Sequence, residues 1–321
     1  MKKMKKTRDL LIYLAVISPY HFIRILPHWA IRALAVFGGY LLNAIPFARN
    51  MVRGNIHAAM PELSAAEVAR IGRQSLINLT WNMLEFVWID GIPKRIQRCC
   101  CMQEETIEMH KKAKAEGRQF IYVNPHLGSW EASGIAGAFF TGMTMAAIAK
   151  PVSNPYLNRL YNTDKREKVG MKVIFSNGAV RGSIKALRAG MNLGTLVDQN
   201  TSIHRGGVYV NFFGLPVSSS PAPAEIKKYC DKHNIPVEIL FGVSLRRQDG
   251  KTESVCIPLP KPFDQYADST EVLQECMNIS EKYIRRYPEQ YLWFYRRFQC
   301  IPAGTAPELQ KRFPYYAEHM S

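Results

Sequence analysis

The sequence predicts an α/β fold in which a mixed sheet is flanked by helices, preceded by an N-terminal helical segment that anchors the chain at a membrane. Short β-rich runs alternate with segments of helical spacing after about residue 103, which is typical of a sheet covered by helices. The first run, residues 120–124, lacks polar alternation and so resembles a buried parallel strand. The 321 residues, 47% of them hydrophobic, suffice to bury a sizeable core.

Residues 1–48 are expected to form the membrane anchor. Two apolar runs, 10–22 and 25–48, follow a basic start that contains Lys2, Lys3, Lys5, Lys6 and Arg8. Proline, histidine and arginine interrupt both runs, so neither offers the about 18 apolar residues of a simple span. We therefore expect an interfacial or re-entrant anchor, with Tyr13, Trp29 and Tyr40 near the headgroups and the basic cluster on anionic lipid.

Two other interpretations of this segment compete with a membrane anchor. A secretory signal also begins with basic residues and an apolar stretch, but the second apolar run and the missing clean cleavage site argue against it. A pair of amphipathic core helices remains the alternative.

The charge balance predicts anionic partners. Lys+Arg total 42 and Asp+Glu 26, which gives a net charge of +16. Anionic lipid, an acidic carrier protein or nucleic acid would suit this charge. Nucleic acid is not expected, because the chain has no helix-turn-helix, RNP or zinc-finger pattern. The seven cysteines include one adjacent triplet and no C-x-x-C pair, so we expect reduced thiols facing the cytoplasm rather than disulfides or structural zinc.

Residues 49–321 are expected to form one catalytic domain. Ser64-Ala-Ala-Glu67 is a capping box, and it opens a long helix that ends near Asp90. Further strands are predicted at 144–149, 172–175, 193–197, 208–212, 237–243 and 255–259, and further helices at 103–116, 131–140, 155–168, 179–189, 223–233 and 270–286.

The candidate catalytic residues, His126 and Glu131, directly follow the predicted strand 120–124. Ligands of α/β sheets bind beyond the carboxyl ends of strands, and a histidine there can take a proton from a hydroxyl while a carboxylate orients its ring. Five residues apart, the two side chains would face different sides of one helix. We therefore place His126 in a loop, as Pro125 and Gly128 indicate. The alternative for an isolated motif is a histidine satisfied by neighbouring backbone.

Four ordered blocks resemble the bacterial lipid A late acyltransferases. They are Pro125-His-Leu-Gly-Ser-Trp-Glu131, Leu196-Val-Asp-Gln199, Asn211-Phe-Phe-Gly214 and Tyr287-Pro-Glu-Gln-Tyr-Leu-Trp-Phe-Tyr-Arg-Arg297. The resemblance covers nearly the whole chain. It implies a glycerolipid-acyltransferase-like fold and an enzyme on the cytoplasmic face of the bacterial inner membrane. Such an enzyme moves an acyl chain from acyl carrier protein to a hydroxyl of a lipid A precursor, with no cofactor or metal.

The resemblance also implies roles for individual residues. His126 would be the general base, with its imidazole aligned by Glu131, and Trp130 matches the tryptophan of the motif. Ser129 stands where the family usually has asparagine, and Pro125 replaces a small polar residue, so the loop departs from the pattern. Arg166 looks like the family's recurring arginine before a glycine. Its expected task is to bind a phosphate or the oxyanion, and a solvated helix face is the alternative.

The remaining candidates are substrate-binding residues. Asp198, beside Gln199 at the end of a predicted strand, could orient Arg166 or a substrate hydroxyl, or it could merely cap a turn. The backbone N–H groups near Gly128 and Ser129 could stabilise the oxyanion. Phe212 and Phe213 are expected to wall the donor side.

The sequence leaves open the identity of the acyl donor and of the acceptor. Coenzyme A could replace the carrier protein as donor, and a lysophospholipid or another glycolipid could be the acceptor. Glycerolipid acyltransferases usually have Asp where Glu131 stands and a Pro-Glu-Gly block downstream, which this sequence lacks. That difference favours the lipid A branch. A zinc hydrolase is disfavoured because two ligands are too few and His110 and His204 lack motif spacing.

Overall fold

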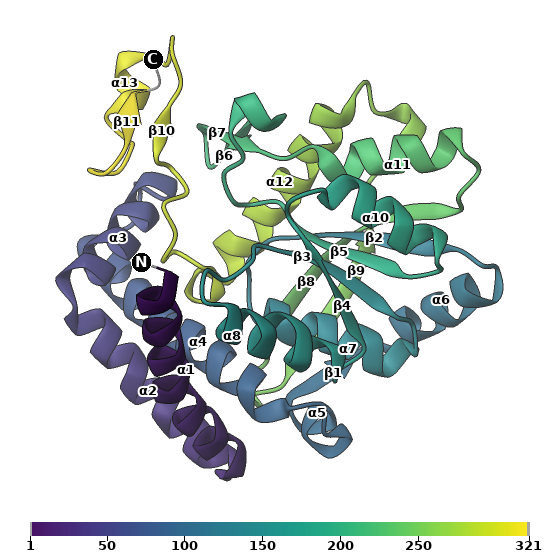
Figure 1. Ribbon diagram of the computed structural model, residues 1–321. Helices are drawn as coiled ribbons and strands as arrows, with labels where there is room; N and C mark the ends of the chain where they lie inside the picture. Colours follow the sequence, from purple (N-terminus) through teal and green to yellow (C-terminus); the bar gives the residue numbers. More distant parts are fainter. Residues whose placement is uncertain (1, 320–321) are drawn as a thin grey trace.

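The computed structural model describes the backbone of residues 2–319 and the side chains of residues 5–319 (Figure 1). The side chains of Lys2 and Lys3, part of the expected basic cluster, lie outside the described residues. The chain begins with five helices: α1 (Lys2–Ile25), α2 (His28–Ala44), α3 (Pro46–Ala59), α4 (Ala65–Ile89) and α5 (Pro93–Cys99).

A seven-stranded sheet follows, with strand order β1-β9-β8-β2-β5-β3-β4. Its strands are β1 (Cys100–Met102), β2 (Gln119–Asn124), β3 (Met145–Ala149), β4 (Met171–Phe175), β5 (Asn192–Leu196), β8 (Val237–Arg246) and β9 (Thr252–Pro258). All neighbours pair in parallel except β8 and β9. The predicted α/β fold with a mixed sheet is therefore confirmed.

Helices cover both faces of this sheet (Figure 1). They are α6 (Glu104–Ala115), α7 (Trp130–Thr141), α8 (Pro155–Asn158), α9 (Lys165–Glu167), α10 (Ala179–Arg188), α11 (Ala222–Lys232) and α12 (Ser269–Arg286). Smaller elements complete the chain: η1 (Arg159–Asp164), η2 (Ile203–Arg205), β6 (Val208–Phe212), β7 (Leu215–Ser219), η3 (Phe263–Gln265), η4 (Pro288–Gln290), β10 (Cys300–Ile301), α13 (Pro307–Gln310) and β11 (Glu318–His319).

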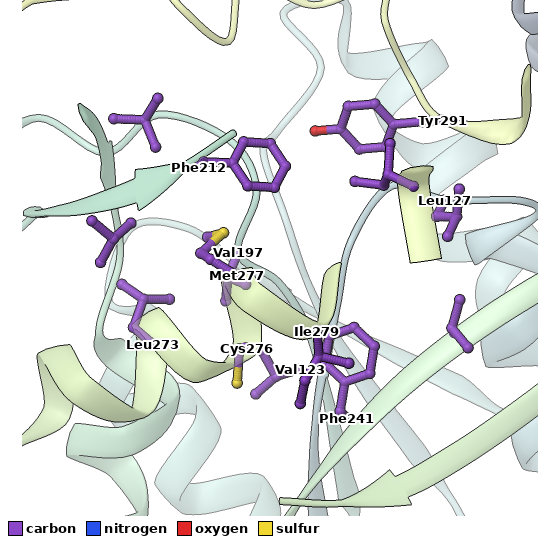
Figure 2. Close-up of a cluster of buried hydrophobic side chains, with 14 of the residues drawn as sticks. Val123, Leu127, Val197, Phe212, Phe241, Leu273, Cys276, Met277, Ile279 and Tyr291 are labelled. Carbon is purple, nitrogen blue, oxygen red and sulfur yellow. The ribbon is translucent and has the colours of Figure 1, made fainter. Parts of the chain in front are cut away.

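The strands alternate between two hydrophobic cores, which explains why the β2 sequence shows no polar alternation. Figure 2 shows the first core, where Val123 of β2 and Phe241 of β8 meet Leu273 and Met277 of α12. Phe120 and Tyr122, the alternate residues of β2, belong to the second core with Ala132 and Ile135 of α7.

Two predicted elements differ from the structure. The strand at 208–212 forms as β6, but it pairs with β7 in a separate antiparallel hairpin rather than in the main sheet. The helix predicted at 155–168 is interrupted by a π-helical turn, η1, between α8 and α9. Strand β1 was not predicted, because three residues are too few to show a pattern.

The N-terminal helices pack on the domain through α4. Ile31, Ala35 and Gly39 of α2 are buried. A Cβ atom on Gly39 would lie 2.5 Å from the Cα atom of Ile77, so the backbones of α2 and α4 are in close contact at this point. The described part of the N-terminal segment is thus joined to the rest of the chain by tight packing and not by a linker.

The outer side of these helices is apolar and exposed. Ile25 is 78% exposed, Trp29 71% and Phe37 62%. Among the described residues, the membrane-span criteria are met by no single helix, whereas α2 and α3 meet them as a pair with an 89° bend between them. The apolar exposed side is therefore carried by bent and paired helices.

Candidate active site

The loop between β2 and α7 holds His126 at the carboxyl end of a central strand. Three hydrogen bonds to two distant segments fix its backbone. The His126 N–H donates to Asp198 Oδ2 (2.8 Å), Leu292 N–H donates to the His126 carbonyl (3.0 Å), and Gly128 N–H donates to the Gln290 carbonyl (2.9 Å). Gly128 has a φ of +62°, and a Cβ there would lie 1.5 Å from the carbonyl oxygen of Ser244. Only glycine fits this position.

The His126 ring lies between Asp198 and Gln199. Its Nδ1 is 2.6 Å from Asp198 Oδ1, and its Nε2 is 3.3 Å from the amide nitrogen of Gln199. A carboxylate can only accept, so Nδ1 carries the proton and Nε2 presents its lone pair. The ring is therefore in the tautomer that a general base requires.

Asp198 is buried, with 2% of its surface exposed. Burial acts to raise the pKa of its carboxyl, but the His126 ring, its two hydrogen bonds and the Arg297 guanidinium outweigh this effect and hold the pKa below its usual value. The Tyr291 hydroxyl also hydrogen-bonds to this carboxylate, and burial raises the pKa of Tyr291 well above the usual value. Asp198 is therefore a fixed anion beside the imidazole.

Glu131 faces Arg166 and not the imidazole. Arg166 donates through Nη2 to Glu131 Oε1 (2.5 Å) and through Nε to Oε2 (3.3 Å), which makes a bidentate pair. Asn162 accepts a short hydrogen bond from the third nitrogen of the same guanidinium. The prediction that Glu131 aligns His126 is thus wrong for this conformation, because Asp198 already occupies Nδ1 and Arg166 binds the Glu131 carboxylate.

A cavity lies between α7 and the sheet, and Glu131 and Arg166 are part of its wall. Glycines line both of its surfaces: Gly134 and Gly137 on α7, Gly194 on β5 and Gly242 on β8. The rest of the wall is mostly apolar, and it includes Met102, Met145, Ala147, Ile148, Met171 and Leu196. The space has the character of a hydrocarbon-binding slot.

Trp130 connects this cavity with His126. Its indole lines the cavity, and its ring centroid lies 5.1 Å from that of His126 in an edge-on arrangement. The His126 side chain is 10% exposed. The His126 imidazole, the Trp130 indole and the Arg166–Glu131 ion pair therefore lie next to one another near the start of α7.

The structure separates the other predicted site residues into two groups. Gly128, Ser129 and Gln199 lie in or against the His126 loop, and Ser129 is the N-cap residue of α7. Phe212 and Phe213 are not brought to the cavity. They are buried at 0% and 2% exposure in the hydrophobic core on the other side of the sheet, because β6 joins its own hairpin. Figure 2 shows Phe212 in this core.

Several residues near the site were missed by the sequence analysis. Asn162 and Tyr291 hold the two charged groups, and Asn82 and Gln290 hold the backbone of the loop. Gln290 and Tyr291 lie in the fourth family-like block, which could have pointed to them, whereas Asn82 of α4 and Asn162 of η1 are linked to the site only by their position in space.

One cluster has the composition of a metal site. His28, Glu85 and Cys99 place ligand atoms within 4.8 Å of one another. Arg246 already binds Glu85 at 2.8 Å, and burial raises the pKa of the Cys99 thiol well above its usual range. A cation at this point would face a guanidinium and a protonated thiol, so the cluster fits an ion pair better than a metal.

The family model of bacterial lipid A biosynthesis acyltransferases matches residues 1–300. The chain belongs to this family. The family assignment confirms the resemblance seen in the four sequence blocks, and this lipid A acyltransferase is an enzyme of the late acylation class.

Curated relatives support the same assignment over most of the chain. A lipid A biosynthesis acyltransferase of Haemophilus influenzae is 23% identical over 293 residues, covering 88% of this chain and 89% of the relative. The lipid A biosynthesis lauroyltransferase of Escherichia coli is 26% identical and covers 79% and 80%. The palmitoleoyltransferase of Escherichia coli is 23% identical and covers 82% and 83%.

Proposed function

We propose that this acyltransferase moves a fatty acyl chain from acyl carrier protein to a hydroxyl of a lipid A precursor, at the cytoplasmic face of the bacterial inner membrane. One observation carries the proposal: an imidazole bonded to a buried carboxylate lies beside an apolar cavity whose wall contains an arginine–glutamate pair. This set suits acyl transfer from a thioester.

In the proposed mechanism His126 is the general base. Asp198 keeps the proton on Nδ1, and the acceptor hydroxyl takes the place of the Gln199 amide at Nε2. As the alcohol oxygen bonds to the thioester carbonyl carbon, its proton passes to Nε2. The tetrahedral intermediate then collapses, the carbon–sulfur bond breaks, and the imidazolium returns the proton to the thiolate of the donor. This base contributes about 10²- to 10⁴-fold.

The pair of Arg166 and Glu131 supplies charge stabilisation in this proposal. Glu131 and Asn162 hold the guanidinium in a fixed orientation at the cavity wall. A cation that is oriented before the reaction stabilises the developing oxyanion without reorganising. Glu131 is then a positioning residue, and Arg166 is the group that meets the reacting oxygen.

The cavity between α7 and the sheet is the proposed site of the acyl chain. Burial of each methylene contributes about 0.8 kcal/mol, so an apolar slot can hold the chain while the thioester stays near Arg166. Gly137 and Gly194, where an added Cβ would have no neighbour closer than 3.7 Å, leave room for the chain, and Met145 and Met171 can adapt to its shape.

The N-terminal helices are the proposed membrane contact. Lys5, Lys6 and Arg8 are exposed next to the apolar surface formed by α1 and α2, and the chain carries a net charge of +16. An apolar surface bordered by cations fits an anionic lipid interface. The same positive charge suits the acidic carrier protein.

The decisive experiment compares donors and acceptors. Purified enzyme is incubated with acyl carrier protein or coenzyme A thioesters and with a lipid A precursor or a lysophospholipid, and products are identified by mass spectrometry. Acylated lipid A precursor from the carrier-protein donor is expected. An unchanged lipid A with an altered phospholipid profile in cells that lack the gene would contradict the proposed acceptor.

A further inference from the structure

We infer that Asn82 is a positioning residue for catalysis, because it closes a ring of hydrogen bonds that holds the Gly128 peptide of the His126 loop. The inference rests on the proposed function, since it takes the residues around this loop as the reaction centre. The ring has four members from four parts of the chain: Asn82 of α4, Gly128, Arg246 of β8 and Gln290 of η4.

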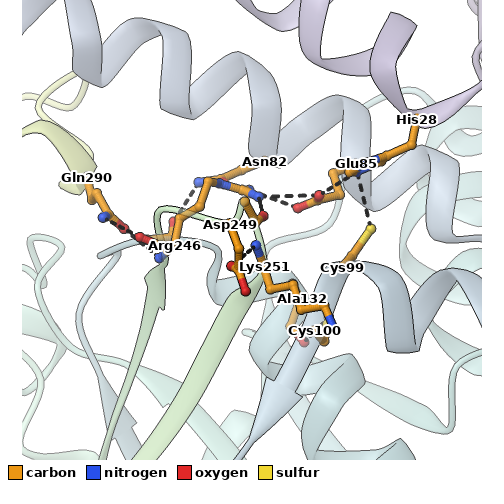
Figure 3. Close-up of polar contacts among 12 residues, drawn as sticks. His28, Asn82, Glu85, Cys99, Cys100, Ala132, Arg246, Asp249, Lys251 and Gln290 are labelled. Carbon is orange, nitrogen blue, oxygen red and sulfur yellow. Dashed lines mark hydrogen bonds and ion pairs between the residues drawn. The ribbon is translucent and has the colours of Figure 1, made fainter.

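The contacts form a continuous ring. The Asn82 amide donates to the Gly128 carbonyl (2.5 Å), and its oxygen accepts from Arg246 NH2 (2.9 Å). The Arg246 backbone exchanges two hydrogen bonds with the Gln290 side chain, at 2.8 Å and 3.0 Å. The Gln290 carbonyl accepts from Gly128 N–H (2.9 Å), which completes the ring. Figure 3 shows Asn82, Arg246 and Gln290 in this arrangement.

Charge fixes the orientation of the Asn82 amide. Arg246 can only donate, so the amide must turn its oxygen toward the guanidinium and its nitrogen toward Gly128. Glu85, which is fully buried, binds the same guanidinium at 2.8 Å, and the guanidinium carbon lies 3.9 Å from the Trp81 ring centroid. Asn82 itself is 3% exposed. Water is therefore a poor substitute for any of these partners.

The ring fixes the backbone of Gly128, which lies between His126 and the start of α7. Gly128 follows His126 by two residues and precedes Glu131 by three, and both its N–H and its carbonyl belong to the ring. A rotation of the backbone at Gly128 would move His126 relative to the start of α7, where Trp130 and Glu131 lie. A displacement of about 1 Å between reacting groups can cost about 10²-fold in rate.

The test replaces the amide without removing its volume. Asn82→Asp keeps the oxygen toward Arg246 and loses the donor to Gly128, whereas Asn82→Leu loses both. We expect kcat to fall about 10- to 100-fold in each variant with KM within about threefold of wild type. Full-length enzyme is assayed with a single donor and acceptor, and thermal unfolding is recorded for every variant.

Asn78 offers a matched control on the same helix. It lies one turn before Asn82, is buried, and donates one hydrogen bond to the Glu289 carbonyl (2.7 Å). Asn78→Asp and Asn78→Leu should lower the melting temperature to a similar extent and leave kcat within about threefold.

The outcomes separate this inference from the proposed function. Folded Asn82 variants with unchanged kcat, or Asn78 variants with an equal loss of kcat, would overturn the positioning role. If Asn82 variants do not fold, Gln290→Glu, which removes only the donor to the Arg246 carbonyl, must show the same loss of kcat at unchanged KM. Full activity in His126→Ala would instead contradict the proposed function.

Discussion

Asp198 Oδ1 lies 2.6 Å from Nδ1 of His126, although 72 positions separate the two residues in the sequence. Because the carboxylate orients the imidazole and keeps the proton on Nδ1, Asp198→Asn should lower kcat by about 10²- to 10⁴-fold. The measurement is kcat of the purified variant, with melting temperatures recorded alongside. An unchanged kcat in a folded variant would show that the carboxylate does not act through the imidazole.

The Arg166–Glu131 pair gives a second prediction. Arg166→Met should lower kcat about 10²- to 10³-fold with little change in KM, if the guanidinium stabilises the oxyanion. Arg166→Lys keeps the charge without the bidentate geometry and should recover part of the loss. A large rise in KM for the acceptor, at constant kcat, would instead identify Arg166 as a ligand of a lipid phosphate.

Gly137 provides a test of the acyl site. A Cβ at this position would lie 3.7 Å from the Met145 sulfur, an ordinary contact, and would narrow the cavity. Gly137→Ala should raise stability by up to about 1 kcal/mol, because glycine is unfavourable within a helix. The same variant should shift kcat/KM toward shorter acyl donors. Equal effects on all chain lengths would exclude this part of the cavity as the acyl site.

The exposed apolar side of α2 predicts membrane binding. Phe37→Glu should reduce flotation with vesicles that contain anionic lipid. A carboxylate at this 62% exposed position opposes insertion of the α2 surface into the bilayer and weakens the attraction to anionic headgroups. Val180→Glu, at a 49% exposed position on α10, serves as the control and should float like wild type. Equal loss in both variants would point to a general charge effect.

Burial of Cys276 predicts a loss of stability at alkaline pH. Burial raises the pKa of this thiol from 9.0 to about 12, so its contribution is complete below pH 9.0 and is lost as pH rises toward 12. Above pH 9.0 the difference in unfolding free energy between wild type and Cys276→Ala should decrease by about 1.4 kcal/mol per pH unit. Denaturant titrations at about pH 8 and about pH 10 measure it. A constant difference would contradict the prediction.

Local patterns predicted the elements of the fold well. The capping box of Ser64 and Glu67 forms as expected at the start of α4, since all of its contacts lie within four residues. The strands around β2 could likewise be predicted from the sequence, because burial on both faces of the sheet produces continuous apolar runs.

Long-range partners could not be predicted in the same way. The position of His126 in a loop followed from Pro125 and Gly128, but the choice of carboxylate did not. Glu131 is five residues away and Asp198 follows the end of another strand, β5, and only the parallel pairing of β2 with β5 brings Asp198 to the ring. The expectation that Phe212 walls the donor side failed for a similar reason, because the sequence of its strand does not show whether the strand joins a hairpin or the main sheet.

Helix α4 touches α2 at Ile77, where a glycine lets the two backbones meet, and five residues later Asn82 bonds to the Gly128 peptide. A continuous helix does not stretch, so about one and a half turns of backbone set the distance between the helices proposed to contact lipid and the proposed reacting groups. An acceptor lipid held in a bilayer would therefore meet His126 at one constant distance from the membrane. The enzyme would then select acceptors by how far the reacting hydroxyl stands above the bilayer, as well as donors by the length of the acyl chain.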